Sequence, residues 1–192
     1  MLKHLIMKNR SYRRFYEEEK IPMEDLRSLI DLARLSPSGA NLQSLKYVLT
    51  NEEKINELIF EQLKWAGYLK NWAGPEKGER PAAYIIIIQD ESISKTCYWD
   101  HGIASQSILL GATEQGYGGC QFGAFNADGI RKVLKLSDAL KPLVVIALGK
   151  PKEVVLLEDL DEEKDIKYYR DEKDVHHVPK RNLKDIIIKK YQ

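Results

Sequence analysis

Two short stretches near the N-terminus hold the side chains best suited to bind a ligand. Residues 10–15 (RSYRRF) contain three arginines and a serine, and residues 36–43 (SPSGANLQ) are mostly small and include the amides of Asn41 and Gln43. Guanidinium groups bind phosphate through charge-assisted hydrogen bonds, and amides both donate and accept hydrogen bonds. Together the two stretches predict a ligand with a phosphate at one end and a polar heterocycle at the other.

Each stretch also has a plain structural explanation. Arg10 and Arg13 would lie one helical turn apart and could hold one phosphate if this segment were helical, with the Ser11 hydroxyl as a further donor. Surface arginines in an ordinary solvated turn are, however, common. Gly39 allows a backbone to come close to a ligand, whereas Pro37 and its neighbours could simply end a helix. Taken alone, neither stretch distinguishes a binding site from a solvated turn.

The rest of the sequence contains no other recognisable catalytic motif. Residues 116–123 are rich in glycine but do not form the GxGxxG turn of a Rossmann site, and no Walker A, HExxH or GxSxG pattern occurs. The adjacent His176 and His177 cannot easily face one metal ion together, and the acidic residues 158–163 lack the central glycine of a calcium loop. We therefore expect no catalytic side chain and no metal site, and chemistry supplied by an organic redox cofactor.

Composition is that of an ordinary globular protein. The chain has 192 residues, of which 43% are hydrophobic and 31% charged, and we expect a single domain over residues 1–192. A formal net charge of +1 predicts no nucleic-acid partner. The absence of a signal-peptide pattern and of a long apolar run predicts a cytoplasmic protein without membrane association. For Cys120, burial as an inert side chain is favoured over a reactive thiol.

The elements that must position these side chains alternate between helix and strand. Helices are predicted to begin at Pro22, after a capping box of Thr50 and Glu53, at Asp100 and near Asn126. Strands are predicted over the apolar runs at residues 47–49, 84–89 and 143–148. By itself, this alternation indicates an α/β sheet.

The remaining segments have weaker signals. Residues 62–81 lose helical periodicity and are expected to form a partly helical excursion, whose aromatic side chains either cover a ligand or simply pack. Gly116 is placed to cap the helix before it. The acidic residues 153–174 are expected to be a solvated connection, and a terminal helix is expected to open at residues 178–183.

Five motifs in order resemble those of the FMN-dependent nitroreductase family, over nearly the whole chain. They are Arg10-Ser11-x-Arg13, the loop Pro37-Ser38-Gly39-x-Asn41-x-Gln43, the helix Asp100-x-Gly102-x-Ala104-x-Gln106 with Gly116-Tyr117-Gly118, the segment Gln121-Phe122-Gly123, and Pro179-Lys180-Arg181. The resemblance implies an α+β fold, a nitroreductase-like three-layer α/β/α sandwich with a central, mostly antiparallel sheet. It also implies an intertwined homodimer with FMN at the subunit interface.

The resemblance assigns one end of the FMN site to the arginine stretch. Arg10 and Ser11 would hold the phosphate and ribityl end of FMN together with Arg181, assisted by Lys180. Arg13 would lie against the pyrimidine edge of the flavin, where a fixed positive charge stabilises the negative charge that develops on reduction.

Two further segments would complete the implied site. Ser38, Gly39 and Asn41, in the loop that begins at Pro37 and ends at Gln43, would reach the cofactor from the partner subunit. Gln121, Phe122 and Gly123 would line the flavin ring. The chain departs from the family pattern after this loop, because Ser44-Leu45 stand where family members often have Pro-Trp.

The implied activity is that of an FMN-dependent NAD(P)H oxidoreductase with a ping-pong mechanism. NADH or NADPH would transfer hydride to flavin N5, and an electron-poor small molecule such as a nitroaromatic or a quinone would then be reduced. No protein acid or base is obligatory in this scheme, since the protein supplies orientation and electrostatics. The alternative is a non-catalytic module that binds FMN to sequester or sense it.

Overall fold

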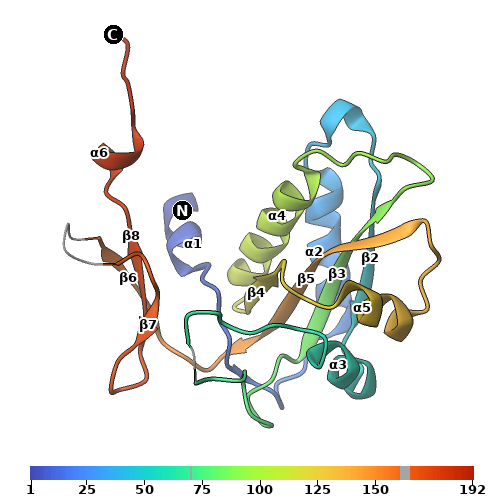
Figure 1. The fold of residues 1–192 in the computed structure, drawn as a ribbon, viewed down its shortest axis with the longest axis horizontal. Helices are drawn as coiled ribbons and strands as arrows, with labels where there is room; N and C mark the ends of the chain where they lie inside the picture. Colours follow the sequence, from blue (N-terminus) through green and yellow to red (C-terminus); the bar gives the residue numbers. More distant parts are fainter. Residues whose placement is uncertain (70, 161–164) are drawn as a thin grey trace.

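A five-stranded sheet forms the centre of the molecule in the computed structural model, which describes residues 1–69, 71–160 and 165–192. Its strands are β1 (Phe15–Tyr16), β2 (Leu45–Thr50), β3 (Ala83–Asp90), β4 (Gly118–Phe122) and β5 (Leu140–Pro151). β3 lies between β2 and β5, while β4 and β1 pair with the other edge of β5 (Figure 1). Every one of these pairings is antiparallel.

The antiparallel pairing corrects the α/β interpretation of the alternating elements. β2 and β3 are joined through a helix, yet they run in opposite directions with Leu45 opposite Gln89. Alternation alone predicts a parallel sheet, because it does not show in which direction the chain returns. The α+β fold with a mostly antiparallel sheet, which the family resemblance implied, is confirmed.

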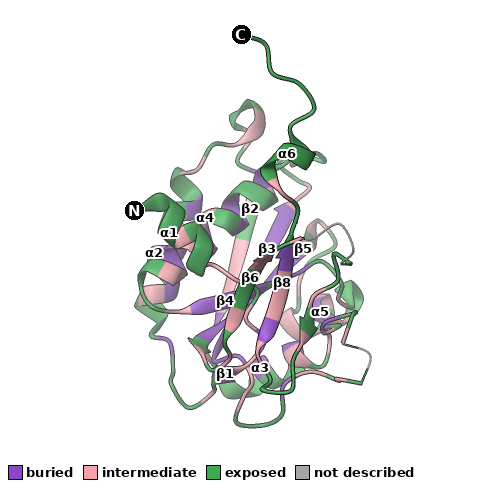
Figure 2. Cartoon of the chain, turned by 90° about the vertical axis from the view of Figure 1, so that its left-hand side faces the viewer, coloured by how far each residue is buried: buried purple, intermediate pink, exposed green. Residues whose placement is uncertain are grey.

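Helices cover both faces of the sheet. Ile85 and Ile87 of β3 pack with α2 (Met23–Leu35) and α4 (Asp100–Glu114). Ile86 and its alternate neighbours pack instead with α3 (Glu53–Phe60) and α5 (Ala127–Leu134). Because successive residues of a strand point to opposite faces, one continuous apolar run serves both layers. Figure 1 shows the two helix pairs on opposite sides of the sheet, and Figure 2 shows buried residues along its strands.

Local signals set most helix ends. α2 ends before Ser36, where Pro37 disfavours helix in the residue that precedes it. α4 is followed by Gly116 with φ +82°, a left-handed conformation that glycine adopts without strain. The Asn126 side chain accepts a hydrogen bond from the Gly129 amide at 3.1 Å and caps α5.

The predicted capping box of α3 is wrong. The residue before the helix is Glu52 rather than Thr50, and no side chain caps it. The Thr50 hydroxyl instead accepts from the Glu52 amide at 3.2 Å and contacts the buried Asn56 side chain at 3.1 Å. The Thr50 hydroxyl, which the sequence pattern assigned to a helix cap, therefore contacts the Asn56 side chain instead.

A second, smaller sheet forms from residues expected to be irregular. Its strands are β6 (Val155–Asp159), β7 (Tyr169–Arg170) and β8 (His176–Lys180), in the order β6-β8-β7. The solvated connection predicted over residues 153–174 is therefore wrong for β6 and β7, while residues 161–164 lie outside the described residues. β8 includes residues 178–180, where the terminal helix was expected to open. β6 and β7 form regular strands because both pair with β8, and the acidic composition did not indicate this pairing.

The N-terminal helix lies beside this second sheet, and the C-terminal segment extends away from it (Figure 1). α1 (Leu2–Lys8) opens the chain, and α6 (Leu183–Ile186) is a single turn followed by an extended end. The predicted terminal helix is thus much shorter than expected, and its apolar residues are exposed. Among the described residues, no helix combines the length and apolar character needed to cross a membrane.

Candidate functional site

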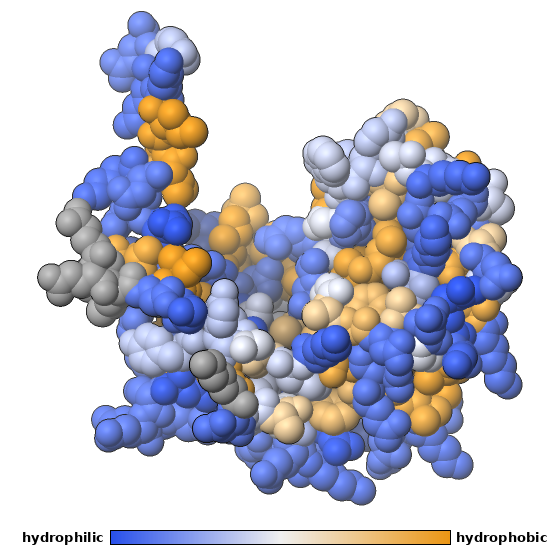
Figure 3. Space-filling view, viewed as in Figure 1, coloured by the Kyte–Doolittle hydropathy of each residue, from blue (hydrophilic) through white to orange (hydrophobic). Residues whose placement is uncertain are grey.

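A cavity of about 360 Å³ lies where the N-terminal stretch meets α4, β4 and β8. We call it the arginine cavity. Five of the predicted site residues line it: Arg10, Ser11, Arg13, Gln121 and Lys180. Figure 3 shows the surface hollowed between the C-terminal part and the helix-covered sheet, and both parts contribute residues to this cavity.

The arginine stretch reaches the cavity as extended chain, so the helical spacing considered for Arg10 and Arg13 is wrong. α1 ends at Lys8, Ser11 forms a parallel bridge with Gly119, and the Tyr12 amide donates to the Gly119 carbonyl at 3.0 Å. Strand β4 can take this neighbour because its first residues lack side chains. A Cβ on Gly118 would lie 2.5 Å from Tyr12 Cδ2 of this stretch.

Arg13 is held from several sides and is only 8% exposed. Its guanidinium donates to the Ser11 carbonyl at 3.1 Å and to His176 Nε2 at 3.2 Å. Its Cζ also lies 4.7 Å from the centre of the Tyr168 ring, a cation–π contact. The Arg13 backbone amide donates to the buried carboxylate of Glu153. The second sheet therefore fixes the orientation of an arginine from the N-terminal stretch.

The cavity carries positive charge without a carboxylate in its described wall. Arg10 donates to the Ile6 carbonyl at 2.6 Å, while its buried Nε has no hydrogen-bond partner among the described residues. Burial lowers the pKa of Arg10 below its ordinary value. Lys180 adds an exposed cation. Such a cavity favours an anionic ligand, whose oxygens can satisfy these donors.

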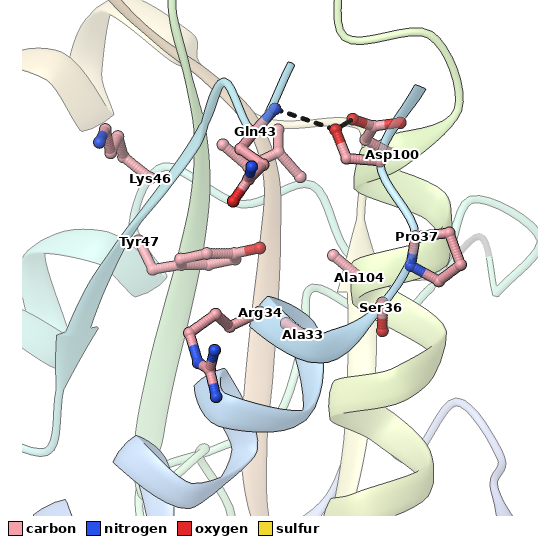
Figure 4. Close-up of a pocket in the computed structure, with 11 residues that line it drawn as sticks. Ala33, Arg34, Ser36, Pro37, Gln43, Lys46, Tyr47, Asp100 and Ala104 are labelled. Atoms are coloured by element: carbon pink, nitrogen blue, oxygen red, sulfur yellow. Dashed lines mark hydrogen bonds between the residues drawn. The ribbon is translucent and has the colours of Figure 1, made fainter. Parts of the chain in front are cut away.

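The loop of residues 36–43 lines a different cavity, of about 240 Å³, between the end of α2, β2 and the start of α4 (Figure 4). Buried Asp100 holds this loop, since it accepts from the Ser38 hydroxyl at 2.6 Å and from the Gly39 amide at 2.8 Å. The Ser38 oxygen in turn accepts from the Gln43 amide at 3.0 Å. The loop is thus built on the first residue of α4.

Within the loop, the predicted residues divide between wall and surface. Pro37, Ser38 and Gln43 line this second cavity, whereas Gly39 and Asn41 do not. Asn41 is exposed and has φ 54°, a left-handed conformation that asparagine adopts more readily than most residues. The two cavities share no lining residue in the described chain.

Besides Gly39 and Asn41, three further predicted site residues line neither cavity. Phe122 is buried on the opposite face of β4 from Gln121, and its ring contacts Trp65 edge-on with centres 4.7 Å apart. Gly123 and Arg181 are exposed beyond the ends of β4 and β8. The period of two along a strand explains why Gln121 and Phe122 cannot both face the same ligand.

Aromatic residues of the 62–81 excursion pack against the protein. Trp65 contacts Phe122, and Trp72 lies under Arg170, with 4.4 Å between the Arg170 Cζ and the ring centre. Tyr68 lies against Tyr168, with ring centres 5.0 Å apart. In the described structure, these aromatic side chains therefore pack against other residues of the protein.

Tyr168 and His176 are among the lining residues of the arginine cavity that sequence reasoning did not assign to the site. Tyr168 lies in the segment expected to be a solvated connection, and His176 was considered only as a metal ligand. The described residues hold no cluster of three or more potential metal ligands. A usable signal was the buried-strand character of residues 175–179, where Val175 and Val178 flank the histidine pair.

Burial shifts the pKa values of two side chains, His176 and Cys120. His176 is 1% exposed, and burial together with Arg13 and Arg170 lowers its pKa to about 4. Burial also raises the pKa of the Cys120 thiol to about 11. Cys120 is therefore protonated at neutral pH, as expected for an inert cysteine.

Known proteins match most of this chain. The family model described as "Nitroreductase family" matches residues 6–150. A Methanothermobacter thermautotrophicus protein, provisionally named NADH dehydrogenase/NAD(P)H nitroreductase, is 29% identical over 154 residues, covering 77% of this chain and 76% of that protein.

Solved structures have the same fold. A nitroreductase family protein from Clostridium novyi NT aligns with a TM-score of 0.67 at 29% identity, over 79% of this chain and 86% of the other. An FMN-dependent nitroreductase from Clostridium difficile R20291 aligns with a TM-score of 0.63 at 24% identity, over 78% of this chain and 87% of the other. The segment matched by the family model ends at residue 150, before Tyr168, His176 and Lys180.

Proposed function

Because this chain belongs to the nitroreductase family, we propose that it is an FMN-dependent oxidoreductase that uses NADH or NADPH to reduce a small electron-poor molecule. The observation that carries this proposal is the arginine cavity, where Arg10, Ser11, Arg13 and Lys180 converge without a carboxylate in the described wall. The names of relatives support the cofactor and the reductant, since one is called FMN-dependent and another an NAD(P)H nitroreductase.

The residues of the cavity fit FMN. A phosphate would supply acceptors for Arg10, whose buried Nε lacks a partner among the described residues, and for the Ser11 hydroxyl and Lys180. Arg13 is fixed by Ser11, His176 and Tyr168, so its charge is available without reorganisation. When bound, FMN supplies the redox chemistry by taking hydride from the nicotinamide and passing reducing equivalents to the acceptor in a ping-pong sequence.

We also propose that two copies of the chain complete each site. The loop of residues 36–43 and the arginine stretch line separate cavities of one chain. In this assembly, the loop of one copy would reach the arginine cavity of the other. Exposed Asn41 and the exposed apolar residues after Asn182 are available for such an interface.

The test is anaerobic reduction of the purified protein after reconstitution with FMN. We expect the flavin absorbance to bleach with NADH or NADPH and to return when a quinone or nitroaromatic is added. FMN binding without bleaching would reject the oxidoreductase and favour the non-catalytic flavin-binding module. Failure to bind FMN at all would reject both.

Riboflavin provides a matched control for the phosphate end. It has the same ring and lacks only the phosphate, so its affinity should be weaker by roughly 1.5–3 kcal/mol, the contribution of hydrogen bonds to a charged group. Equal affinities for FMN and riboflavin would reject the role assigned to Arg10, Ser11 and Lys180.

A further inference from the structure

His176 is a buried histidine in the wall of the arginine cavity. It begins β8, is 1% exposed, and its backbone amide donates to the Val154 carbonyl at 2.9 Å. Its ring centre lies 5.2 Å from that of Tyr168, and both residues line the cavity. β8 therefore fixes the position of this ring, and the residue belongs to the site rather than to the outer surface.

The contact with Arg13 determines which ring nitrogen of His176 carries a proton. Arg13 Nη1 lies 3.2 Å from His176 Nε2. A guanidinium donates hydrogen bonds and cannot accept them, so Nε2 must be the acceptor and must be unprotonated. A neutral imidazole has one N–H, and the proton is therefore on Nδ1.

This Nδ1–H group is an unsatisfied buried donor. Nδ1 is buried and has no hydrogen-bond partner among the described residues. A buried donor without a partner costs free energy that a bound acceptor can recover. A second proton on the ring is disfavoured because burial, together with the nearby Arg13 and Arg170, lowers the pKa of His176.

We propose that His176 is a ligand-binding residue of the arginine cavity, holding Arg13 through Nε2 and donating through Nδ1–H to an oxygen of bound FMN. This inference rests on the proposed function and adds a residue from beyond the family-matched segment. The described part of the cavity wall has no carboxylate to accept from this donor, and an oxygen of a bound ligand can do so. The flavin cofactor has oxygen acceptors at both its ring and its phosphate.

Two substitutions separate the two nitrogens of His176. In His176→Gln, the amide oxygen can take the place of Nε2 and accept from Arg13, but no donor remains at the position of Nδ1. In His176→Asn, the shorter amide can place a donor near the position of Nδ1 but cannot reach Arg13. Both variants replace the imidazole with an uncharged amide. Loss of the ring therefore cannot by itself explain a difference in FMN affinity between them.

The quantity to measure is the dissociation constant for FMN. It is obtained by titrating the FMN-free protein with FMN and following the quenching of flavin fluorescence. We expect His176→Gln to weaken FMN binding about tenfold, the upper range for a neutral hydrogen bond, and His176→Asn to weaken it less than about threefold. Wild-type affinity in His176→Gln, or equal weakening in both variants, would reject the Nδ1–H contact. Circular dichroism and thermal melting establish that each variant is folded.

A measurement on the unmodified protein decides the case if a variant does not fold. The imidazole N–H signal of His176 in nitrogen-edited NMR should shift when FMN is added, because the donor gains an acceptor. An unchanged signal at saturating FMN would overturn the inference while leaving the proposed function intact. Failure of the wild-type protein to bind FMN would reject the proposed function, and this inference with it.

Discussion

At the scale of single residues, the arginine cavity depends on cations that keep their charge available. The nearby carboxylate of Glu153 is buried and already accepts from the Arg13 amide and from Arg170, the latter at 3.0 Å. It therefore fixes the backbone of Arg13, while the guanidinium contacts Ser11, His176 and Tyr168 and keeps its positive charge. Arg10 has the other partly satisfied guanidinium, with a buried Nε that lacks a partner among the described residues.

Replacement of Arg10 tests this arrangement directly. We expect Arg10→Ala to reduce FMN affinity by roughly 1.5–3 kcal/mol, because a charge-assisted contact to phosphate is lost. Arg27→Ala is the matched control, since the Arg27 side chain is 71% exposed on α2 and lies outside both cavities. Fluorescence titration with FMN measures both variants, and an unchanged affinity in Arg10→Ala would contradict the assignment.

At the scale of elements, the arginine stretch is anchored where β1 joins the edge of β5. Phe15, the last residue of this stretch, is fully buried and pairs with Pro151. Close packing at this point requires Gly149, because a Cβ there would lie 2.7 Å from Phe15 Cδ1. The site therefore depends on a glycine that never touches the ligand.

The substitution Gly149→Ala should destabilise the protein by about 1–3 kcal/mol, because the added methyl group overpacks the buried Phe15 ring. Gly102→Ala is a suitable control, since Gly102 is exposed on α4 and a methyl group added there would meet nothing within 4 Å. There we expect stabilisation of up to about 1 kcal/mol from helix propensity. Urea denaturation measures both, and a Gly149→Ala protein as stable as wild type would disprove the packing argument.

A histidine clamp links β8 to β6 and to the residue that follows β7. His177 of β8 contacts Glu158 of β6 through Nδ1 at 2.5 Å and Asp171 through Nε2 at 3.2 Å. The hydrogen bond with Glu158 is the main cause that raises the pKa of His177. The folded protein then binds this proton more tightly than the unfolded chain does.

The clamp predicts a definite pH dependence. Its stabilisation is fully present below the unfolded pKa of about 6.5 and is lost as the pH rises through the raised pKa of the folded state. The melting temperature of wild type should therefore exceed that of His177→Gln by more at about pH 6 than at about pH 9. High salt should shrink the difference at the lower pH. An advantage that grows with pH would refute the clamp.

At the scale of the whole molecule, the C-terminal segment extends away from the body of the protein (Figure 1). Ile188 is 94% exposed, and Leu183 and Ile186 are also largely exposed. Figure 3 shows these apolar side chains along the projecting segment. Exposed apolar residues in a row favour burial against another surface.

Removal of residues 183–192 tests whether this segment joins two copies. We expect the truncated protein to keep its circular dichroism spectrum and to dissociate to monomers at concentrations where the full chain is a dimer. FMN affinity should fall in parallel, because the loop of residues 36–43 in one copy would no longer reach the arginine cavity of the other copy. Sedimentation velocity gives the state of both proteins, and a truncated dimer with unchanged FMN affinity would argue against this assembly.

Several features could be predicted from the sequence because local chemistry alone decides them. The apolar run of β3 predicts a strand buried on both faces, and Pro37 predicts the end of α2 at Ser36. Gly116 marks the end of α4 because left-handed backbone favours glycine. The five ordered motifs likewise identify the family and, with it, the antiparallel sandwich.

What local chemistry could not decide was where distant segments meet. Arg10 and Arg13 were expected to share a helical face, yet they reach one cavity as extended chain because Ser11 and Tyr12 bind to Gly119. Tyr168 and His176 join them only because the second sheet brings residues more than 150 positions away against Arg13. The sequence by itself determined the residue types for binding a phosphate-bearing heterocycle and the family. The tertiary structure decided which donors surround the cavity and which remain unpaired, because these depend on long-range packing rather than on spacing along the chain.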